Sequence, residues 1–440
     1  MEHQIIFGTS VLYNKVPMLD NPIITYPGTA YDGSTTFRID EDVFSKHLLL
    51  LGGSGCGKTN TFFFTVDAIR KQIKEDDIII IFDTKGEYYK LFAVEGDYVI
   101  GNSPKFRKKS CTWNIFDEIL ADGDDEDSIS MNARELSSAL FHGRGSTTQP
   151  FFSNAAKDLF CGILLHFIRQ AKRDPSNWLK KLNNNDLIRA FRCFKVDNYI
   201  KIFNYYPDLR SLLSYFGDGK SNQALGVFGE LNSMLSDYFI GILAEHDPNR
   251  SISMRQAVRK KGARALFIEY DLSVGETLTP VYRLLVDQAL KEALSRSQNT
   301  GKVYLIADEF KLLPKLQHID DALNFGRGLG VRVMAGIQSI DQLYDVYGKD
   351  KGAVIASGFG SIFAFHTNDA SSREYISKRF GANIFIYEYM DTQRNRYDSN
   401  ERNGNTVEEW DQAELGLGQA VIGLGYNPPF LFQFDQYEGE

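Results

Sequence analysis

The residues whose chemistry is clearest lie in one stretch, LLLLGGSGCGKTN at 48–60. Gly52 is followed by four residues and then by GKT at 57–59, a spacing typical of loops that bind nucleoside triphosphates. Glycines let backbone N–H groups surround phosphate oxygens at a helix N-terminus. Lys58 can then reach the β- and γ-phosphates, and the Thr59 hydroxyl can ligate Mg²⁺. The predicted nucleotide-binding residues are Gly52, Gly53, Ser54, Gly55, Cys56, Gly57, Lys58, Thr59 and Asn60.

This loop stands in the sequence context that its chemistry requires. The apolar run at 48–51 predicts a buried parallel strand, and TNTFFFTVDAIRKQI at 59–73 predicts a helix. The alternative is a glycine-rich turn that matches the motif by chance. The complete motif between a strand and a helix favours the phosphate-binding interpretation.

Acidic residues close a second apolar run, VYLIADE at 303–309. We predict that Asp308 holds Mg²⁺, directly or through water, and that Glu309 polarises the attacking water as the general base. The alternative is the solvated edge of a strand; the phosphate loop upstream favours catalysis, because hydrolysis needs a base beside the γ-phosphate. Glu87, in FDTKGEYY at 82–89, is a second candidate for the base. Helix capping is the rival interpretation of the charges in that segment.

Two further side chains are predicted to act with Lys58 and Glu309 in catalysis. The strand expected in VRVMAGIQSIDQL delivers Gln338 to the same end of the sheet, where its amide could distinguish bound ATP from ADP. A glutamine that caps the next helix is the alternative. Arg327 lies between glycines in NFGRGLG. In ring ATPases such an arginine reaches into the neighbouring site and stabilises the developing γ-phosphate charge, whereas a surface arginine without a role is the alternative.

The elements that must position these residues follow an alternating pattern. Strand-length apolar runs lie at 48–51, 78–83, 265–270, 303–308, 331–337 and 361–366. Helical stretches such as 279–295 lie between most of them, which predicts an α/β fold with a doubly wound parallel sheet. In such a sheet the site lies at the carboxyl ends of the strands.

The remaining segments complete the predicted domain organisation. Residues 150–170 carry apolar side chains at three- and four-residue steps, and no comparable strand run occurs near them. We predict an N-terminal β flap at 1–46, a first part of the nucleotide-binding domain at 47–131, an inserted all-α domain at 132–250, and a second part with a C-terminal β hairpin at 251–440. The polar, Asn/Arg-rich segment 390–409 is predicted to be a surface loop.

Composition limits the partners and the compartment. With 440 residues and a formal net charge of −8, any nucleic-acid surface must be local, such as a pore or groove. The acidic stretch 122–127 and the basic runs 107–109 and 255–264 are best explained as solvated, although the basic runs could face DNA. The four cysteines, Cys56, Cys111, Cys161 and Cys193, lack metal-ligand spacing, which fits a reducing cytosol. The apolar runs at 48–51 and 78–82 are far shorter than the roughly 20 residues of a membrane span, and no signal peptide is visible.

The ordered motifs resemble one known family, the TraG/TraD-type coupling proteins of type IV secretion and conjugation, in the FtsK/HerA branch of RecA-like motor ATPases. The matching segments are HLLLLGGSGCGKT at 47–59, FDTKGEYY at 82–89, WNIFD at 113–117, 263–290, LIADEF at 305–310, 325–348 and LGLGQAVIGLGYNPPF at 415–430. The resemblance implies a RecA-like phosphate-loop domain with an inserted all-α domain. It also implies a hexameric ring that hydrolyses ATP at subunit interfaces and pumps DNA, usually single-stranded with an attached relaxase, toward a secretion channel.

Members of the family usually carry N-terminal transmembrane helices, and this sequence shows none. The chain is then a cytoplasmic member recruited to the inner face of the cell membrane by a separate membrane subunit, a chain lacking its anchor, or a relative that processes DNA elsewhere. Two other functions stay open at this point. One is a HerA-like motor that works with a nuclease or a defence effector, and the other is a nucleotide-dependent adaptor for protein substrates.

Overall fold

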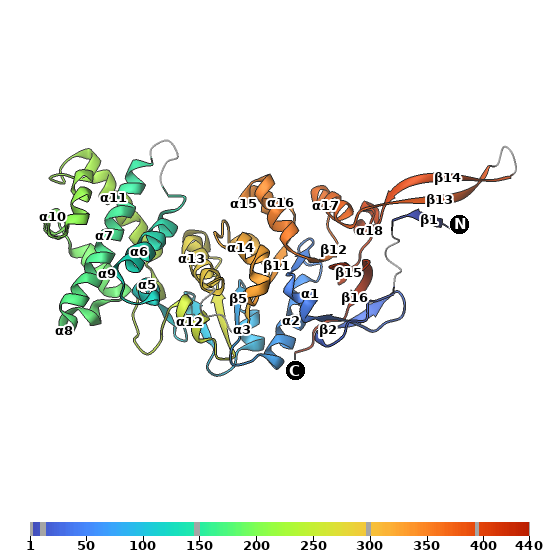
Figure 1. Cartoon of the computed structure of the whole chain (residues 1–440), viewed down its shortest axis with the longest axis horizontal. Helices are drawn as coiled ribbons and strands as arrows, with labels where there is room; N and C mark the ends of the chain where they lie inside the picture. Colours follow the sequence, from blue (N-terminus) through green and yellow to red (C-terminus); the bar gives the residue numbers. More distant parts are fainter. Residues whose placement is uncertain (1–2, 9–14, 145–149, 296–300, 392–395, 440) are drawn as a thin grey trace. The chain divides into compact units, whose positions relative to one another are not determined.

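The computed structural model describes residues 3–8, 15–144, 150–295, 301–391 and 396–439 (Figure 1). The chain forms two compact units. The first, here called the sheet unit, consists of 1–96, 262–265 and 293–440. The second, the helical unit, consists of 97–261 and 266–292. The helical unit is therefore wider than the segment 132–250 singled out above, and the four domain boundaries derived from the sequence remain predictions.

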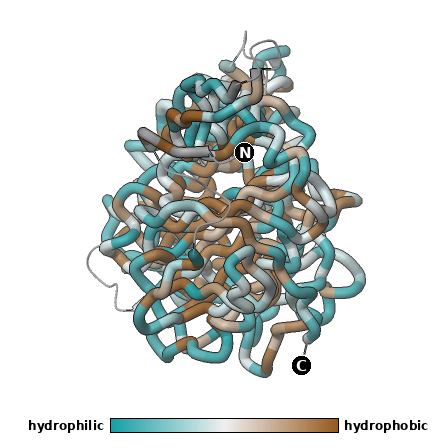
Figure 2. The backbone as a smooth tube through the Cα atoms, turned by 90° about the vertical axis from the view of Figure 1, so that its right-hand side faces the viewer, coloured by the Kyte–Doolittle hydropathy of each residue, from teal (hydrophilic) through white to brown (hydrophobic). Residues whose placement is uncertain are grey.

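Parallel strands form the centre of the sheet unit. Their order is β12 (Ser361–Phe365), β4 (Leu48–Leu51), β11 (Val331–Ile337), β10 (Val303–Ala307) and β5 (Ile78–Asp83). Every residue of these strands is buried, which explains why each is an unbroken apolar run and not an alternating one. Figure 2 shows hydrophobic, brown segments crossing the middle of the backbone trace. The predicted α/β fold with a mainly parallel sheet is confirmed.

Antiparallel strands extend the same sheet beyond β12. β15 (Gln419–Leu424) pairs with β12, β16 (Phe430–Phe434) with β15, β2 (Pro22–Ala30) with β16, and β3 (Thr36–Asp40) with β2. Aromatic rings pack together in this region. For example, the ring of Phe37 packs against those of Tyr26 and Phe432, with ring centroids 4.7 Å apart in both cases. Strands near the two ends of the sequence are thus continuous with the sheet that carries the phosphate loop.

The prediction of a surface loop at 390–409 is wrong. β13 (Ala382–Asp391) and β14 (Arg396–Asn405) pair antiparallel along their whole length, and β1 (His3–Phe7) pairs with the other edge of β13. Figure 1 shows this hairpin extending away from the sheet of the same unit. Pairing supplies backbone hydrogen bonds to a polar segment, so β14 needs no apolar run to be a strand.

The helices of the sheet unit connect its strands. They are α1 (Glu41–Ser45), α2 (Lys58–Gln72), α3 (Glu87–Phe92), α14 (Ile319–Asn324), α15 (Asp341–Tyr347), α16 (Lys349–Gly358), α17 (Ala370–Phe380) and α18 (Glu409–Ala413), with the short helices η5 (Phe310–Leu312) and η6 (Gly326–Leu329). Among them, α2 and α3 begin directly after β4 and β5 by way of short loops. These two loops open at the edge of the sheet where the parallel strands end.

The helical unit is built around α7 (Phe151–Arg173). Its other helices are α4 (Pro104–Arg107), α5 (Ile115–Ile119), α6 (Glu126–Phe141), α8 (Pro175–Trp178), α9 (Asn184–Cys193), α10 (Val196–Tyr205), α11 (Asn222–Tyr238), α12 (Met254–Lys260) and α13 (Gly275–Ala293), with η1 (Leu120–Asp122), η2 (Leu179–Lys181), η3 (Pro207–Tyr215) and η4 (Gly241–Leu243). Two parallel pairs, β6 (Tyr98–Gly101) with β9 (Arg264–Glu269) and β7 (Thr112–Trp113) with β8 (Ser251–Ile252), complete it. The described part of 132–250 contains helices and no strand.

Within the described residues, α7 alone is long and apolar enough to cross a membrane by length and composition. In the folded chain, 72% of its most apolar window is buried inside the protein. Among the described residues, α7 is therefore a longer apolar segment than the strands at 48–51 and 78–82. Because most of α7 is buried, its apolar composition is that of a core helix.

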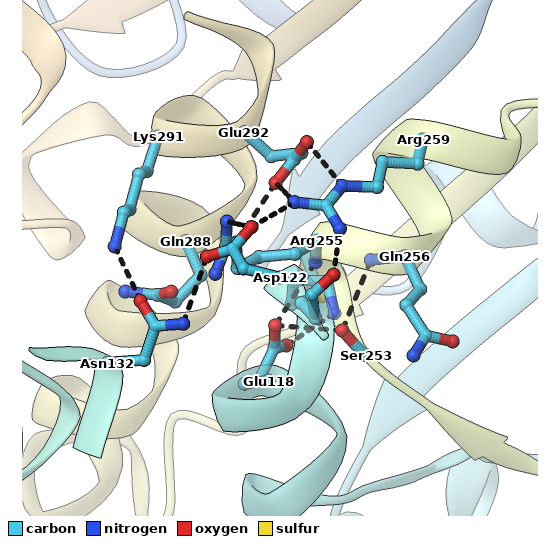
Figure 3. A network of polar contacts seen from close by, with 12 residues as sticks. Glu118, Asp122, Asn132, Ser253, Arg255, Gln256, Arg259, Gln288, Lys291 and Glu292 are labelled. Atoms are coloured by element: carbon cyan, nitrogen blue, oxygen red, sulfur yellow. Dashed lines mark hydrogen bonds and ion pairs between the residues drawn. The ribbon is translucent and has the colours of Figure 1, made fainter. Parts of the chain in front are cut away.

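An ionic network in the helical unit corrects the expectation that the basic run 255–264 is solvated (Figure 3). Arg255 has a side chain only 5% exposed and donates from Nε to Glu292 at 3.0 Å and from Nη2 to Asp122 at 2.7 Å. Arg259 bonds the same two carboxylates. Asp122 and these arginines therefore join η1, α12 and α13. Arg255 is not part of a solvated face, whereas the acidic stretch 122–127 is exposed, as predicted.

Candidate functional site

The phosphate loop is anchored to the ends of the neighbouring strands. The N–H of Gly52 donates to the carbonyl of Ile337 at the end of β11 at 3.2 Å, and that of Gly53 donates to His366 after β12 at 2.8 Å. α2 begins at Lys58, and its N-cap residue Gly57 has φ 111° and makes no side-chain capping bond. A helix N-terminus without a side-chain cap is suited to an anion, because its backbone donors remain to be satisfied. The loop therefore fits a phosphate group.

Lys58 lies inside the loop that it is predicted to serve. Its side chain is buried, and Nζ donates to the carbonyls of Gly52 at 2.6 Å and Gly53 at 2.9 Å. These bonds hold the ammonium group beside the uncapped N-terminus of α2. A cation in this position matches the role predicted for Lys58 toward the β- and γ-phosphates.

Thr59 and Asp308 meet across the sheet edge, although 249 residues separate them in the sequence. Thr59 Oγ1 donates to Asp308 Oδ2 at 2.6 Å. Burial raises the pKa of Asp308, while the hydrogen bond from Thr59 opposes this rise and the charge of Glu309 adds to it. A hydroxyl and a carboxylate are oxygen ligands of the kind that Mg²⁺ prefers. In the described ranges no cluster of three or more His, Cys, Asp or Glu could hold a metal, so phosphate oxygens would have to complete this coordination.

Glu309 and Gln338 form the second pair at this edge. They follow β10 and β11, which are adjacent parallel strands, and Nε2 of Gln338 donates to both carboxylate oxygens of Glu309, at 3.2 and 3.3 Å. Parallel strands of matched register bring the residues after them to one level, which is why both side chains arrive together. The amide is therefore in direct contact with the predicted general base.

Tyr88 is a site residue that sequence analysis missed. Its hydroxyl donates to Asp308 Oδ2 at 3.2 Å, the oxygen that also accepts from Thr59. Its ring is buried, and burial raises its pKa well above the ordinary value, so the hydroxyl stays a donor. The only sequence signal is its place shortly after the strand next to β10.

Asp83 sets the position of Tyr88. Its carboxylate accepts from the backbone N–H of Lys85 at 2.9 Å and of Tyr88 at 3.0 Å, and the chain turns at Gly86, which has φ 69°. For Asp83 the rival interpretation of this segment, helix capping, is therefore what the structure shows. Glu87 is exposed at the first position of α3.

Arg327 lies at the opposite edge of the sheet from the phosphate loop. It belongs to η6 just before β11, whereas the loop follows the end of β4, which is parallel to β11. Its Nη2 donates to Asp42 Oδ1 at 2.6 Å, and both side chains are more than half exposed, at 52% and 57%. Arg327 is therefore not part of the site of its own chain, and a catalytic role would require a second copy.

The remaining residues of the phosphate loop differ in exposure and in the contacts of their side chains. Ser54 and Gly55 are exposed, whereas Cys56 is buried and burial raises the pKa of its thiol. The side chain of Asn60 is engaged elsewhere: Nδ2 donates to the carbonyl of Asp435 at 2.8 Å, and Oδ1 accepts from the N–H of Tyr437 at 2.7 Å. Only the backbone of Asn60 is then available to a nucleotide.

The sheet, the loop between β4 and α2, and the acidic residues after β10 define a RecA-like phosphate-loop protein. The chain belongs to the family of the type IV secretion-system coupling protein DNA-binding domain, whose model matches residues 35–409. The predicted family is confirmed.

Known relatives are distant in sequence and close in fold. The conjugal transfer protein TraG of Escherichia coli is 21% identical over 341 residues, which cover 72% of this chain and 53% of TraG. The chain thus spans about half the length of that relative. The plasmid coupling protein TrwB, solved with a non-hydrolysable ATP analogue, has a TM-score of 0.71 at 19% identity and covers 100% of this chain and 96% of TrwB. TrwB solved with ADP and Mg²⁺ gives 0.70 at 20% identity and covers 94% and 89%.

Proposed function

We propose that this chain is an ATPase that drives DNA through a ring, as the motor part of a type IV secretion coupling protein. The observation that carries the proposal is the contact of Thr59 with Asp308 beside the pair Glu309 and Gln338. A hydroxyl and a carboxylate that could ligate Mg²⁺ thus lie beside a carboxylate that could act as the base, which supports the proposal. The nucleotides bound in the related TrwB structures support the same site.

Each residue has a distinct task in the proposed reaction. Backbone N–H groups of the loop and Lys58 would hold the phosphates, and Thr59 and Asp308 would hold Mg²⁺, which would supply positive charge against the phosphate oxygens. Glu309 accepts a proton from the attacking water. Gln338, bonded to both oxygens of Glu309, can report the presence of the γ-phosphate to the strand that carries it.

The substrate and the assembly extend this proposal. We expect a hexamer in which Arg327 of one copy reaches the site of the next, and single-stranded DNA, with a relaxase or another attached protein, as the cargo. The work would take place in the cytoplasm at the inner face of the cell membrane, where a membrane subunit or a segment of a longer chain holds the motor. The matched family model, described as DNA-binding, supports DNA as the substrate class.

The test compares two glutamates with the same substitution. Glu309→Gln should keep nucleotide binding and lose most single-stranded-DNA-stimulated turnover, by about 10²- to 10⁴-fold for a general base. Glu87→Gln, a matched change at an exposed position, should keep turnover near the wild-type level. The reverse pattern would make Glu87 the base. Turnover that no DNA stimulates, in preparations where rings are seen, would overturn the translocase and favour the protein-substrate adaptor.

A further inference from the structure

An exposed leucine stands on a rigid loop next to the phosphate loop. Leu417 is 75% exposed and lies between α18 and β15. The backbone around it is fixed, because Gly416 N donates to Gln419 Oε1 at 2.8 Å and Gln433 Nε2 donates to the carbonyl of Leu417 at 3.1 Å. Single exposed apolar residues are common on protein surfaces, but a backbone held on both sides presents this side chain in one place.

The loop of Leu417 touches the phosphate loop directly. Gly418 N donates to the carbonyl of Cys56 at 3.0 Å. A Cβ added to Gly57 would lie 3.0 Å from Gly418 Cα, and both glycines have positive φ, of 111° and 75°. The two loops approach closely at Gly57, where a side chain would crowd Gly418.

The order of the strands shows which part of a nucleotide would face this leucine. β15 runs antiparallel to β12 with Phe365 opposite Ala420, so β15 begins at the edge where β12 and β4 end. Asp308 and Glu309, like the other residues that follow β10 and β11, lie at that edge on one side of the phosphate loop. Leu417 lies on the other side. A nucleotide whose terminal phosphate points to the acidic residues must then extend its nucleoside toward β12 and β15.

Segment 435–437 is attached to the helix that follows the phosphate loop, on the same side as Leu417. Asn60 bonds its backbone through both side-chain polar atoms, and the Tyr437 ring packs against Phe63 and Phe64 of α2, with ring centroids 5.7 and 5.1 Å apart. This region of the site is therefore built from tethered backbone, and it presents the exposed apolar side chain of Leu417 together with the exposed polar side chains of Asp435 and Gln436.

We propose that Leu417 is the surface on which the base of the bound nucleotide packs, an inference that rests on the proposed function of the phosphate loop. A leucine side chain offers contact area but no hydrogen bond, and its carbonyl is occupied by Gln433. Adenine and guanine nucleotides should consequently gain equally from this contact. Leu417 is a residue for affinity toward the nucleoside and not for selection among purines.

The experiment separates the nucleoside from the phosphates. Calorimetric titrations of the full chain with ATP, GTP and inorganic tripolyphosphate, each with Mg²⁺, are compared between wild type and Leu417→Ser. We expect Kd to rise about tenfold for both ATP and GTP and to stay unchanged for tripolyphosphate, as for the loss of part of a buried leucine contact. Leu417→Phe should bind both nucleotides at least as tightly as wild type. Leu225→Ser, at a position 61% exposed in the helical unit, is the matched control and should change nothing.

Several results would overturn the inference. Equal ATP affinity of wild type and Leu417→Ser, or equal affinity of wild type for ATP and tripolyphosphate, would show that the base does not pack on Leu417. A parallel loss of tripolyphosphate binding would show damage to the phosphate loop instead of a lost contact. If Leu417→Ser changes only the oligomeric state in sedimentation, the leucine belongs to a subunit interface. Failure of wild type to bind either ATP or tripolyphosphate would refute the proposed function itself.

Discussion

Replacing Arg255 distinguishes a structural from a DNA-binding role for the basic run at 255–264. The Arg255 guanidinium is 5% exposed and bonds Asp122 and Glu292, the second of which is only 2% exposed. Removing one partner of a buried ion pair leaves an uncompensated buried charge and costs about 3–5 kcal/mol. Arg107→Ala is the control, because its ion pair with Glu245 in the same unit is 53% and 48% exposed and such pairs are worth about 0–1 kcal/mol.

The free energy of unfolding of the helical unit is the quantity to measure. Trp113 and Trp178 lie in that unit and Trp410 in the sheet unit, so denaturation is followed by tryptophan fluorescence in a Trp410→Phe background. Arg255→Ala should lower the melting temperature of the helical unit by about 6–20 °C, at about 2–4 °C per kcal/mol for this size. Below the transition, its DNA affinity and salt dependence should match those of wild type.

The pH dependence of the same measurement gives a second check. Burial alone would raise the pKa of Asp122, but hydrogen bonds from Arg255, Asn132 and Arg259 outweigh it and hold the pKa below its ordinary value. A lowered pKa contributes stability that is complete above the unfolded-state value of about 3.9 and is lost as the pH falls below it. Wild type should therefore lose more stability in acid than Arg255→Ala does. A cost within about 1 kcal/mol of that for Arg107→Ala, or a DNA affinity that falls while stability is kept, would refute the structural role.

Three further outcomes are expected. Tyr88→Phe removes a hydrogen-bond donor that stabilises the charged form of Asp308. In a Mg²⁺ titration of the ATPase rate, the Mg²⁺ concentration for half-maximal turnover should therefore rise by about tenfold. Tyr89→Phe is the control and should leave that concentration unchanged. Mixing Arg327→Ala with Lys58→Ala subunits should restore part of the turnover, because one type of mixed interface keeps both residues, and no recovery in confirmed mixed rings would exclude Arg327 from the site. DNA binding should require assembly and weaken steeply with salt, since a chain of net charge −8 can offer cations only locally; tight, salt-insensitive binding by the monomer would contradict DNA binding inside a ring.

The parts of the site that could be predicted from the sequence share one physical cause. Lys58, Thr59, Asp308, Glu309 and Gln338 all follow unbroken apolar runs, and such runs are buried parallel strands. The carboxyl ends of parallel strands meet at one edge, so residues far apart in the sequence converge without any knowledge of the contacts between them. The contacts of Thr59 with Asp308 and of Gln338 with Glu309 are the observed result.

Other parts depend on pairing between distant segments that leaves no local pattern. The polar strand β14 exists because it pairs with β13, and Arg255 is buried because Asp122 and Glu292 arrive from two other elements. Composition alone indicated a loop and a solvated face at these places. Charge and polarity predict exposure only when no partner compensates them, and the partners here come from elsewhere in the fold.

Asn60 shows that a specific motif does not determine what a side chain inside it contacts. The motif places it at the start of α2, where a role toward phosphate is the natural expectation, yet both polar atoms of its side chain bond segment 435–437. The same helix therefore offers an uncapped N-terminus in the phosphate loop and holds segment 435–437 with its third residue. Because the loop of Leu417 and segment 435–437 both lie beyond β12, a nucleotide bound along this edge would connect the acidic residues after β10 to the antiparallel half of the sheet. Nucleotide exchange would then alter the contacts of both halves at once, which is the property that a motor needs to convert hydrolysis into movement.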